Sequence, residues 1–167
     1  LQNKGYQVLF LAGGASLEFL MVPYNLMKVN GKAAYLETGT WAVNAIKEAK
    51  LFGETQIVAS SSDSNFNFIP KNYEIPTNAD YFHCTSNNTI FGTQMKSFPK
   101  TNVPLVCDMS SDIFSRTMNF KQFSLIYAGA QKNMGAAGVN LVVIKKDLLG
   151  KINRSKDKPV SIIIEES

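Results

Sequence analysis

Short runs of apolar residues alternate along this chain with longer stretches in which apolar residues recur at helical spacing. Most of the short runs are bounded by Gly, Pro, Asn or Ser, which end strands and begin turns. Strands that alternate with helices form βαβ units, in which neighbouring strands are parallel and helices pack against the sheet. The pattern therefore predicts an α/β fold of three layers, with a mostly parallel sheet and helices on both faces.

The expected elements follow from the position of each run. We predict strands at Val8–Ala12, Lys32–Leu36, Thr55–Ala59, Tyr81–Thr85, Leu105–Cys107, Ser124–Tyr127, Val139–Lys145 and Val160–Ile164. Helices are predicted at Ser16–Met27, at Trp41–Phe52 and from Asp147 to Gly150. Pro23 lies inside the first of these helices, which predicts a kink or a later start. Ligands of such sheets bind at the carboxyl ends of the strands, so polar residues that follow a strand are the candidates for a site.

Composition narrows the class of protein. The 167 residues suffice for one domain, and 45% hydrophobic with 18% charged residues is typical of a globular chain. No apolar run approaches the roughly 18 residues of a membrane span, and no secretory signal opens the chain. The net charge of +4 comes with no nucleic-acid motif. We therefore expect a cytoplasmic protein with neither a membrane nor a nucleic acid as partner.

The few metal-binding residue types are isolated from one another. His83 is the single histidine, and Cys84 and Cys107 show no CxxC spacing. We expect no metal site, a packed His83 and two buried free thiols.

A lysine and an aspartate follow two of the predicted strands. Lys132 lies just past Ser124–Tyr127 among small residues, and an unprotonated lysine can form an imine with an aldehyde. Asp108 ends the run at Leu105–Cys107 and could pair with the ring nitrogen of a pyridoxal cofactor. Taken singly, each has a common alternative: a surface lysine, and an aspartate that caps a turn.

Two further features complete a possible cofactor site. Gly13 and Gly14 separate a strand from a helix that begins near Ser16, and a helix N-terminus binds anions such as phosphate. Trp41, the single tryptophan, follows a predicted strand and could stack on a planar ring or pack in the core. A lysine, an acid, an anion site and a stacking aromatic together are what pyridoxal phosphate requires.

Several segments resemble the phosphoserine aminotransferases, a family of aminotransferase class V with the type I fold. The segment Gly129–Gly135 with Ala137 and Gly138 resembles the family's cofactor-lysine motif, and Gly13–Phe19 with Val22–Asn25 resembles its phosphate loop and helix. The segments Thr38–Trp41, Ala45–Ala49, Ser86–Ile90 and Cys107–Ile113 match in the same order, and the likeness runs from about Val8 to Gly150. Gln131 stands where cysteine desulfurases usually carry a histidine.

The resemblance implies a role for each matched residue. Lys132 would attach pyridoxal 5'-phosphate and move the proton at the substrate's α-carbon, and Asp108 would pair with the ring nitrogen. Trp41 would stack on the ring, and Thr89 would contact its hydroxyl side. The phosphate would be bound by Ala15 and Ser16 together with Ser110 and Gln131.

The reaction that the resemblance implies is amino transfer from glutamate to 3-phosphohydroxypyruvate, giving phosphoserine and 2-oxoglutarate for serine biosynthesis by a homodimer. Family members are about twice as long, so residues 1–154 correspond to the cofactor-binding core of the large domain and 155–167 to an unmatched tail. The N-terminal segment and the small C-terminal domain, which carry substrate-binding cations, have no counterpart here. Arg116 and Arg154 are the chain's two arginines, and neither falls in a substrate motif. Two alternatives stay open: a non-catalytic domain that binds the cofactor or a partner, and another class V aminotransferase.

Overall fold

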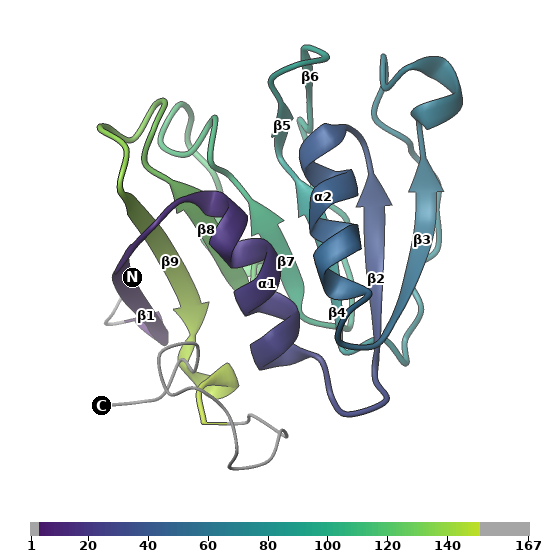
Figure 1. Cartoon of the computed structure of the whole chain (residues 1–167), viewed down its shortest axis with the longest axis horizontal. Helices are drawn as coiled ribbons and strands as arrows, with labels where there is room; N and C mark the ends of the chain where they lie inside the picture. Colours follow the sequence, from purple (N-terminus) through teal and green to yellow (C-terminus); the bar gives the residue numbers. More distant parts are fainter. Residues whose placement is uncertain (1–3, 151–167) are drawn as a thin grey trace.

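The computed structural model of the chain describes residues 4–150. Its strands are β1 (Tyr6–Ala12), β2 (Lys32–Glu37), β3 (Glu54–Ser60), β4 (Tyr81–Thr85), β5 (Asn87–Asn88), β6 (Thr93–Gln94), β7 (Leu105–Asp108), β8 (Leu125–Gly129) and β9 (Val139–Lys145). Its α-helices are α1 (Ala15–Leu26) and α2 (Thr40–Ala49), and 3-10 turns occupy Ser62–Ser64, Phe120–Gln122 and Lys146–Leu148. Seven strands form one sheet in the order β1-β9-β8-β7-β4-β2-β3, while β5 and β6 form a separate hairpin (Figure 1).

The direction of the strands gathers the polar residues at one edge of the sheet. Strands β8, β7, β4, β2 and β3 are parallel to one another, and β9 is antiparallel to both β8 and β1. Strand β1 therefore runs in the same direction as the parallel group. The carboxyl ends of β1, β2, β4, β7 and β8 meet at the edge that also carries the β5–β6 hairpin, at the top of Figure 1. The mostly parallel sheet of an α/β fold is confirmed.

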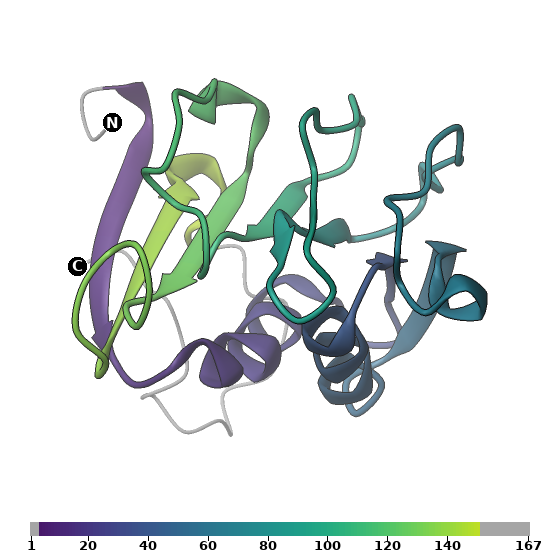
Figure 2. The same ribbon diagram turned by 90° about the horizontal axis from the view of Figure 1, so that it is seen from above.

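The two faces of the sheet are covered differently. Both α-helices of residues 4–150 lie on one face, where they bury one hydrophobic cluster against the sheet (Figure 2). That cluster includes Phe19 and Val22 from α1 and Ala45 from α2. The opposite face is packed by irregular segments through side chains such as Tyr73 and Phe98. We predicted helices on this face as well, but in the described part of the chain this layer is coil. The segments that cross this face are rich in Pro, Asn and Ser and lack a helical pattern.

Two local expectations differ from the structure. Helix α1 begins at Ala15 and continues through Pro23, so the later start, one of the two alternatives predicted for this proline, is wrong. The helix expected from Asp147 is only a 3-10 turn at Lys146–Leu148, because the chain turns away at Gly150, whose φ of 69° interrupts a right-handed helix. The strand predicted at Val160–Ile164 lies outside the described residues.

The histidine and the two cysteines, the residues of metal-binding type that the sequence isolates, are all in the core. His83 is 1% exposed, its Nε2 lies 2.9 Å from the Tyr127 hydroxyl, and burial lowers its pKa to about 3. Cys84 and Cys107 are buried free cysteines opposite each other on β4 and β7. The prediction of a packed histidine and two buried thiols is confirmed. Residues 4–150 contain no cluster of ligating side chains for a metal ion. Within the same residues, no helix has the length and apolar character to cross a membrane.

Candidate cofactor site

A cavity of about 120 Å³ opens at the carboxyl edge of the sheet, beside the first turns of both α-helices. Its walls come from five parts of the chain that are distant in sequence: the start of α1, the start of α2, the end of β4 with the following hairpin, the loop after β7, and the loop after β8. The cavity is lined by all eight residues that we predicted from the sequence to bind a cofactor: Ala15, Ser16, Trp41, Thr89, Asp108, Ser110, Gln131 and Lys132. The structure thus brings the whole nominated set together, as the rule for parallel sheets predicts.

Lys132 reaches the cavity from the loop that joins β8 to β9. Its Nζ donates a hydrogen bond of 2.9 Å to Thr89 Oγ1, which lies on the β5–β6 hairpin. The lysine is exposed, and the small residues around it leave the approach to its amine open. A lysine that is held by one hydroxyl and faces a cavity can reach an aldehyde bound there.

Asp108 forms the floor of the cavity at the end of β7 and is 4% exposed. Its Oδ1 accepts two hydrogen bonds from Ser110, one from the backbone N–H at 2.9 Å and one from the hydroxyl at 2.6 Å. Burial raises the pKa of this carboxyl, while the bonds from Ser110 and the charge of Lys132 oppose the rise. A protonated ring nitrogen placed against Asp108 would favour its ionised form.

Helix α1 points its N-terminus at the same cavity. Its N-cap is Gly14, which has no side chain to occupy the first N–H groups of the helix. The Asn140 side chain from β9 secures this end by donating to the Gly14 carbonyl (2.9 Å) and to the Glu18 carboxylate (3.2 Å). A methyl group added at Gly129 would come within 3.0 Å of Ala15 N, so only glycine lets β8 approach the helix start so closely. Ala15 and Ser16 are thereby placed to offer backbone N–H groups to an anion.

Trp41 lies half-buried in the first turn of α2 and forms another wall of the cavity. The start of α2 is joined to the hairpin, because Thr38 Oγ1 donates to Asn88 Oδ1 at 3.2 Å. A methyl group on Gly39 would come within 2.9 Å of the same oxygen, so glycine permits this contact as well. The indole is therefore held by a rigid helix beside the loop that carries Thr89.

Five cavity residues were not nominated from the sequence: Gly14, Phe19, Thr85, Asn87 and Ser111. Thr85 is the most informative of them. It is opposite Asp108 in the register of β4 and β7, so both side chains project from the same face of the sheet. In the sequence, the alternation of side chains along β4 already put Thr85 on the same face as Tyr81 and His83. The pairing register of β4 with β7 was needed to show that Thr85 lies beside Asp108.

Cations for a doubly anionic substrate are scarce around the cavity. Arg116, the single arginine among residues 4–150, is not one of its lining residues. Instead it forms an ion pair with Asp112 (3.6 Å) and donates to the Met95 carbonyl (2.6 Å). Of the described residues that line the cavity, Lys132 is the one cation.

Comparison with known proteins agrees with this geometry. The chain is 74% identical over 154 residues to the phosphoserine aminotransferase of Flavobacterium psychrophilum, covering 92% of this chain and 43% of that protein. A solved phosphoserine aminotransferase from Bacillus circulans subsp. alkalophilus superposes with a TM-score of 0.90 at 49% identity, over 95% of this chain and 44% of that one. A pyridoxal-phosphate-bound phosphoserine aminotransferase from Trichomonas vaginalis gives 0.86 at 34% identity, over 95% and 46%.

The chain thus spans less than half the length of the relatives it matches. The family model "Aminotransferase class-V" matches residues 1–158, which is most of the sequence. The resemblance seen in the sequence is confirmed by all three kinds of comparison, and the chain belongs to the aminotransferase class-V family.

Proposed function

We propose that this chain forms the pyridoxal 5'-phosphate site of a phosphoserine aminotransferase. One observation carries the proposal: Lys132, Asp108 and the N-terminus of α1 surround a single cavity in a class V chain. The pyridoxal-phosphate-bound relative supports the choice of cofactor. The name shared by the most similar relatives supports the choice of activity.

The side chains around the cavity fit this cofactor. Thr85 Oγ1 is buried and has no hydrogen-bond partner among the described residues, although it lies in the cavity wall. A buried hydroxyl without a partner costs free energy, and a polar ligand could supply the missing bond. The remaining groups match the cofactor's parts: an amine for its aldehyde, a carboxylate that accepts from its ring nitrogen, and N–H and hydroxyl donors for its phosphate.

Each residue would then have a separate task. Asp108 would accept a hydrogen bond from the ring nitrogen, and the indole of Trp41 would cover the ring. The phosphate would be bound by the first N–H groups of α1 with Ser16, Ser110 and Gln131. Thr89 would contact the hydroxyl side of the ring and orient the amine of Lys132. This amine would attach the cofactor covalently and carry the proton at the substrate's α-carbon. When bound, pyridoxal phosphate supplies an electron sink that stabilises negative charge at that carbon.

For substrates we propose glutamate and 3-phosphohydroxypyruvate, with phosphoserine and 2-oxoglutarate as products in serine biosynthesis. Both substrates carry two anionic groups and need positioned cations, normally arginines. Arg116 is engaged with Asp112, and Lys132 is the one cation among the described residues that line the cavity, so we propose that these cations come from other parts of the protein. Catalysis therefore requires the remainder of a full-length family member or an equivalent partner.

Further proposals concern assembly and location. We propose a homodimer, in which exposed apolar side chains such as Phe10 (72% exposed) and Phe114 (60%) become covered. The two buried free thiols fit a reducing compartment, which supports a cytoplasmic location. Residues 1–154 would form the cofactor-binding core of the large domain, with 155–167 as a tail. Light scattering of the purified protein tests the dimer directly.

The decisive experiment adds pyridoxal phosphate to the protein, reduces the mixture with borohydride and maps the modified peptide. We expect a yellow absorbance band and a stable adduct on Lys132. Glutamate and 3-phosphohydroxypyruvate are then added, and phosphoserine is measured. The transfer assay is repeated after the segments that a full-length relative has and this chain lacks are added. If the adduct on Lys132 forms but no amino group is transferred in either assay, a non-catalytic cofactor-binding domain is favoured. Transfer to other keto acids alone would favour another class V aminotransferase. No adduct on Lys132 in folded protein would refute the proposed site.

A further inference from the structure

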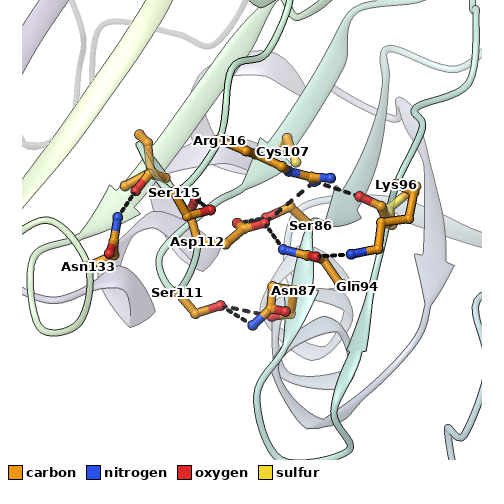
Figure 3. A network of polar contacts seen from close by, with 12 residues as sticks. Ser86, Asn87, Gln94, Lys96, Cys107, Ser111, Asp112, Ser115, Arg116 and Asn133 are labelled. Carbon is orange, nitrogen blue, oxygen red and sulfur yellow. Dashed lines mark hydrogen bonds and ion pairs between the residues drawn. The ribbon is translucent and has the colours of Figure 1, made fainter.

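The loop after β7 holds together the two loops that supply Thr89 and Lys132. We name residues 109–116 the clasp. On one side Asn87 Nδ2 donates to Ser111 Oγ (2.9 Å), and Ser111 Oγ donates to the Asn87 carbonyl (3.0 Å), which secures the start of the hairpin (Figure 3). On the other side Asn133 Nδ2, next to the lysine, donates to the Ile113 carbonyl (2.7 Å). Neither contact involves a residue nominated for the cofactor.

Asp112 is the centre of the clasp. Its carboxylate accepts hydrogen bonds from both ends of the hairpin: Ser86 Oγ donates to Oδ1, and Gln94 Nε2 donates to Oδ2 at 3.0 Å (Figure 3). Ser86 immediately precedes β5 and Gln94 ends β6, so one carboxylate closes the base of the loop that carries Thr89. The backbone supports the same closure, because Met95 N–H donates to the Ser86 carbonyl (2.8 Å).

The charge of buried Asp112 is compensated by the neighbouring Arg116. It is 3% exposed, and Arg116 pairs with its Oδ2 at 3.6 Å while donating to the Met95 carbonyl at 2.6 Å. A buried acid with this many partners has one arrangement available, and removal of its charge would leave a guanidinium without its counterion. The hairpin base is therefore fixed by charge as well as by hydrogen bonds.

We propose that Asp112 is a positioning residue that holds Thr89 at hydrogen-bond distance from the Lys132 amine. It is not one of the residues that line the cavity, so it acts through the hairpin and not by contact with a ligand. The contact that it maintains, Lys132 Nζ to Thr89 Oγ1 at 2.9 Å, connects two loops 43 residues apart in sequence. Its consequence for cofactor binding rests on the proposed function above.

The test compares Asp112→Asn with Thr89→Ala and with the double variant. With pyridoxal phosphate bound, we expect Asp112→Asn to move the pH midpoint of the cofactor's absorbance by about half a unit, in the direction seen for Thr89→Ala. Because both changes break the same contact, the double variant should show little more than Thr89→Ala alone. The dissociation constant for the cofactor should rise about tenfold in each single variant.

A second readout needs no cofactor. Amide hydrogen exchange across residues 87–95 should become faster in Asp112→Asn, while α2 keeps its protection. Asp80→Asn is the matched control, because the Asp80 side chain is also little exposed (6%) and is paired with a long cation, Lys28, but lies before β4 at the opposite edge of the sheet. Should Asp112→Asn fail to fold, Gln94→Met removes a single partner of the carboxylate and is expected to show the same changes at smaller size.

The outcomes separate this inference from the function on which it rests. A wild-type protein that traps no adduct on Lys132 refutes the proposed cofactor site, and hydrogen exchange then still decides whether Asp112 fixes the hairpin. If the wild-type protein binds the cofactor and Asp112→Asn shifts neither the absorbance midpoint nor the exchange of residues 87–95, the positioning role is overturned. Additive shifts in the double variant would also overturn it, because they would mean that Asp112 does not act through Thr89.

Discussion

The two ends of the sheet contain the same kinds of charged residue but arrange them in opposite ways. At the amino end two acids face lysines: Lys28 Nζ lies 3.4 Å from Asp80, and Lys32 Nζ lies 2.9 Å from Glu54. At the carboxyl end Asp108 is hydrogen-bonded by Ser110, while the amine of Lys132 is directed to the hydroxyl of Thr89. These two acids at the amino end are thus compensated by lysines, whereas the cavity at the carboxyl end keeps the amine of Lys132 and the carboxylate of Asp108 without an ion pair between them.

Burial increases this difference. Lys28 is 65% exposed, and such surface ion pairs contribute only about 0–1 kcal/mol. At the carboxyl end, burial raises the pKa of both Asp108 and Glu18, so the folded protein there disfavours negative charge. A cationic group on a ligand would relieve that cost, which is a reason for a ligand to bind at this end. Charged residues therefore indicate a site only where the fold leaves their charge uncompensated.

The largest expected effect is that of Lys132→Ala. Borohydride-stable attachment of pyridoxal phosphate should be abolished, because no other amine lines the cavity among the described residues. The fold should be unaffected, since the side chain is exposed. Lys28→Ala, which removes an exposed lysine from the amino end, is the control and should keep the adduct. If peptide mapping of Lys132→Ala finds as much adduct on another lysine as the wild type carries on Lys132, the cavity lysine is not special among the lysines of the two ends.

Glu18→Gln should change the pH dependence of stability. Burial raises the pKa of Glu18 from 4.5 to about 7, with the hydrogen bond from Asn140 opposing the rise. The folded protein therefore binds the proton of the Glu18 carboxyl more tightly than the unfolded chain does. The protonated carboxyl contributes its full share to the free energy of unfolding below about pH 4.5, and this contribution is lost as the pH rises to about 7. Glutamine does not titrate and can still accept from Asn140, so the variant should be more stable at pH 8 by on the order of 3 kcal/mol. Urea unfolding at pH 4.5 and pH 8 measures the difference, and equal curves for both proteins at pH 8 would contradict it.

Asp108→Asn should separate binding from stability. Loss of a charge-assisted hydrogen bond to the ring nitrogen should weaken pyridoxal phosphate binding by about 10- to 100-fold. The cofactor-free variant should be at least as stable as the wild type at pH 8, because the buried charge is absent. Titration by absorbance and thermal unfolding give the two quantities. Weakened binding together with a large loss of stability would mean that Asp108 is mainly structural.

The smallest effect is expected at the amino end, for Asp80→Asn. Its ion pair with Lys28 is largely exposed on the lysine side, and asparagine can still accept from the Lys28 N–H, now at 3.1 Å. We expect a loss of stability of about 1 kcal/mol or less, which decreases at high salt, and no change in cofactor affinity. Altered affinity in this variant would show that the two ends are coupled.

The sequence predicted most of the sheet but not how it is covered. The seven strands predicted before Gly150 are all present, because each apolar run is long enough to be a buried strand and is bounded by turn residues. Helix positions were right to within a few residues at α1 and α2, although α2 ends at Ala49 and not at Phe52. The coil layer was missed because irregular segments have no periodic pattern, and apolar side chains such as Phe98 are recognisable as core only after packing.

Taken alone, the sequence determined the residue types of the site and their order along the chain. A lysine, an aspartate, a glycine loop and a tryptophan, each at or after the end of a different strand, are local features. Because these strands run in the same direction, their carboxyl ends meet at one edge. Only the tertiary structure decided which neighbours share that edge. The register between β4 and β7 put Thr85 beside Asp108, and the clasp put Asp112 beneath the hairpin of Thr89. Such contacts join segments that are far apart in the chain, and they depend on packing that no local pattern records.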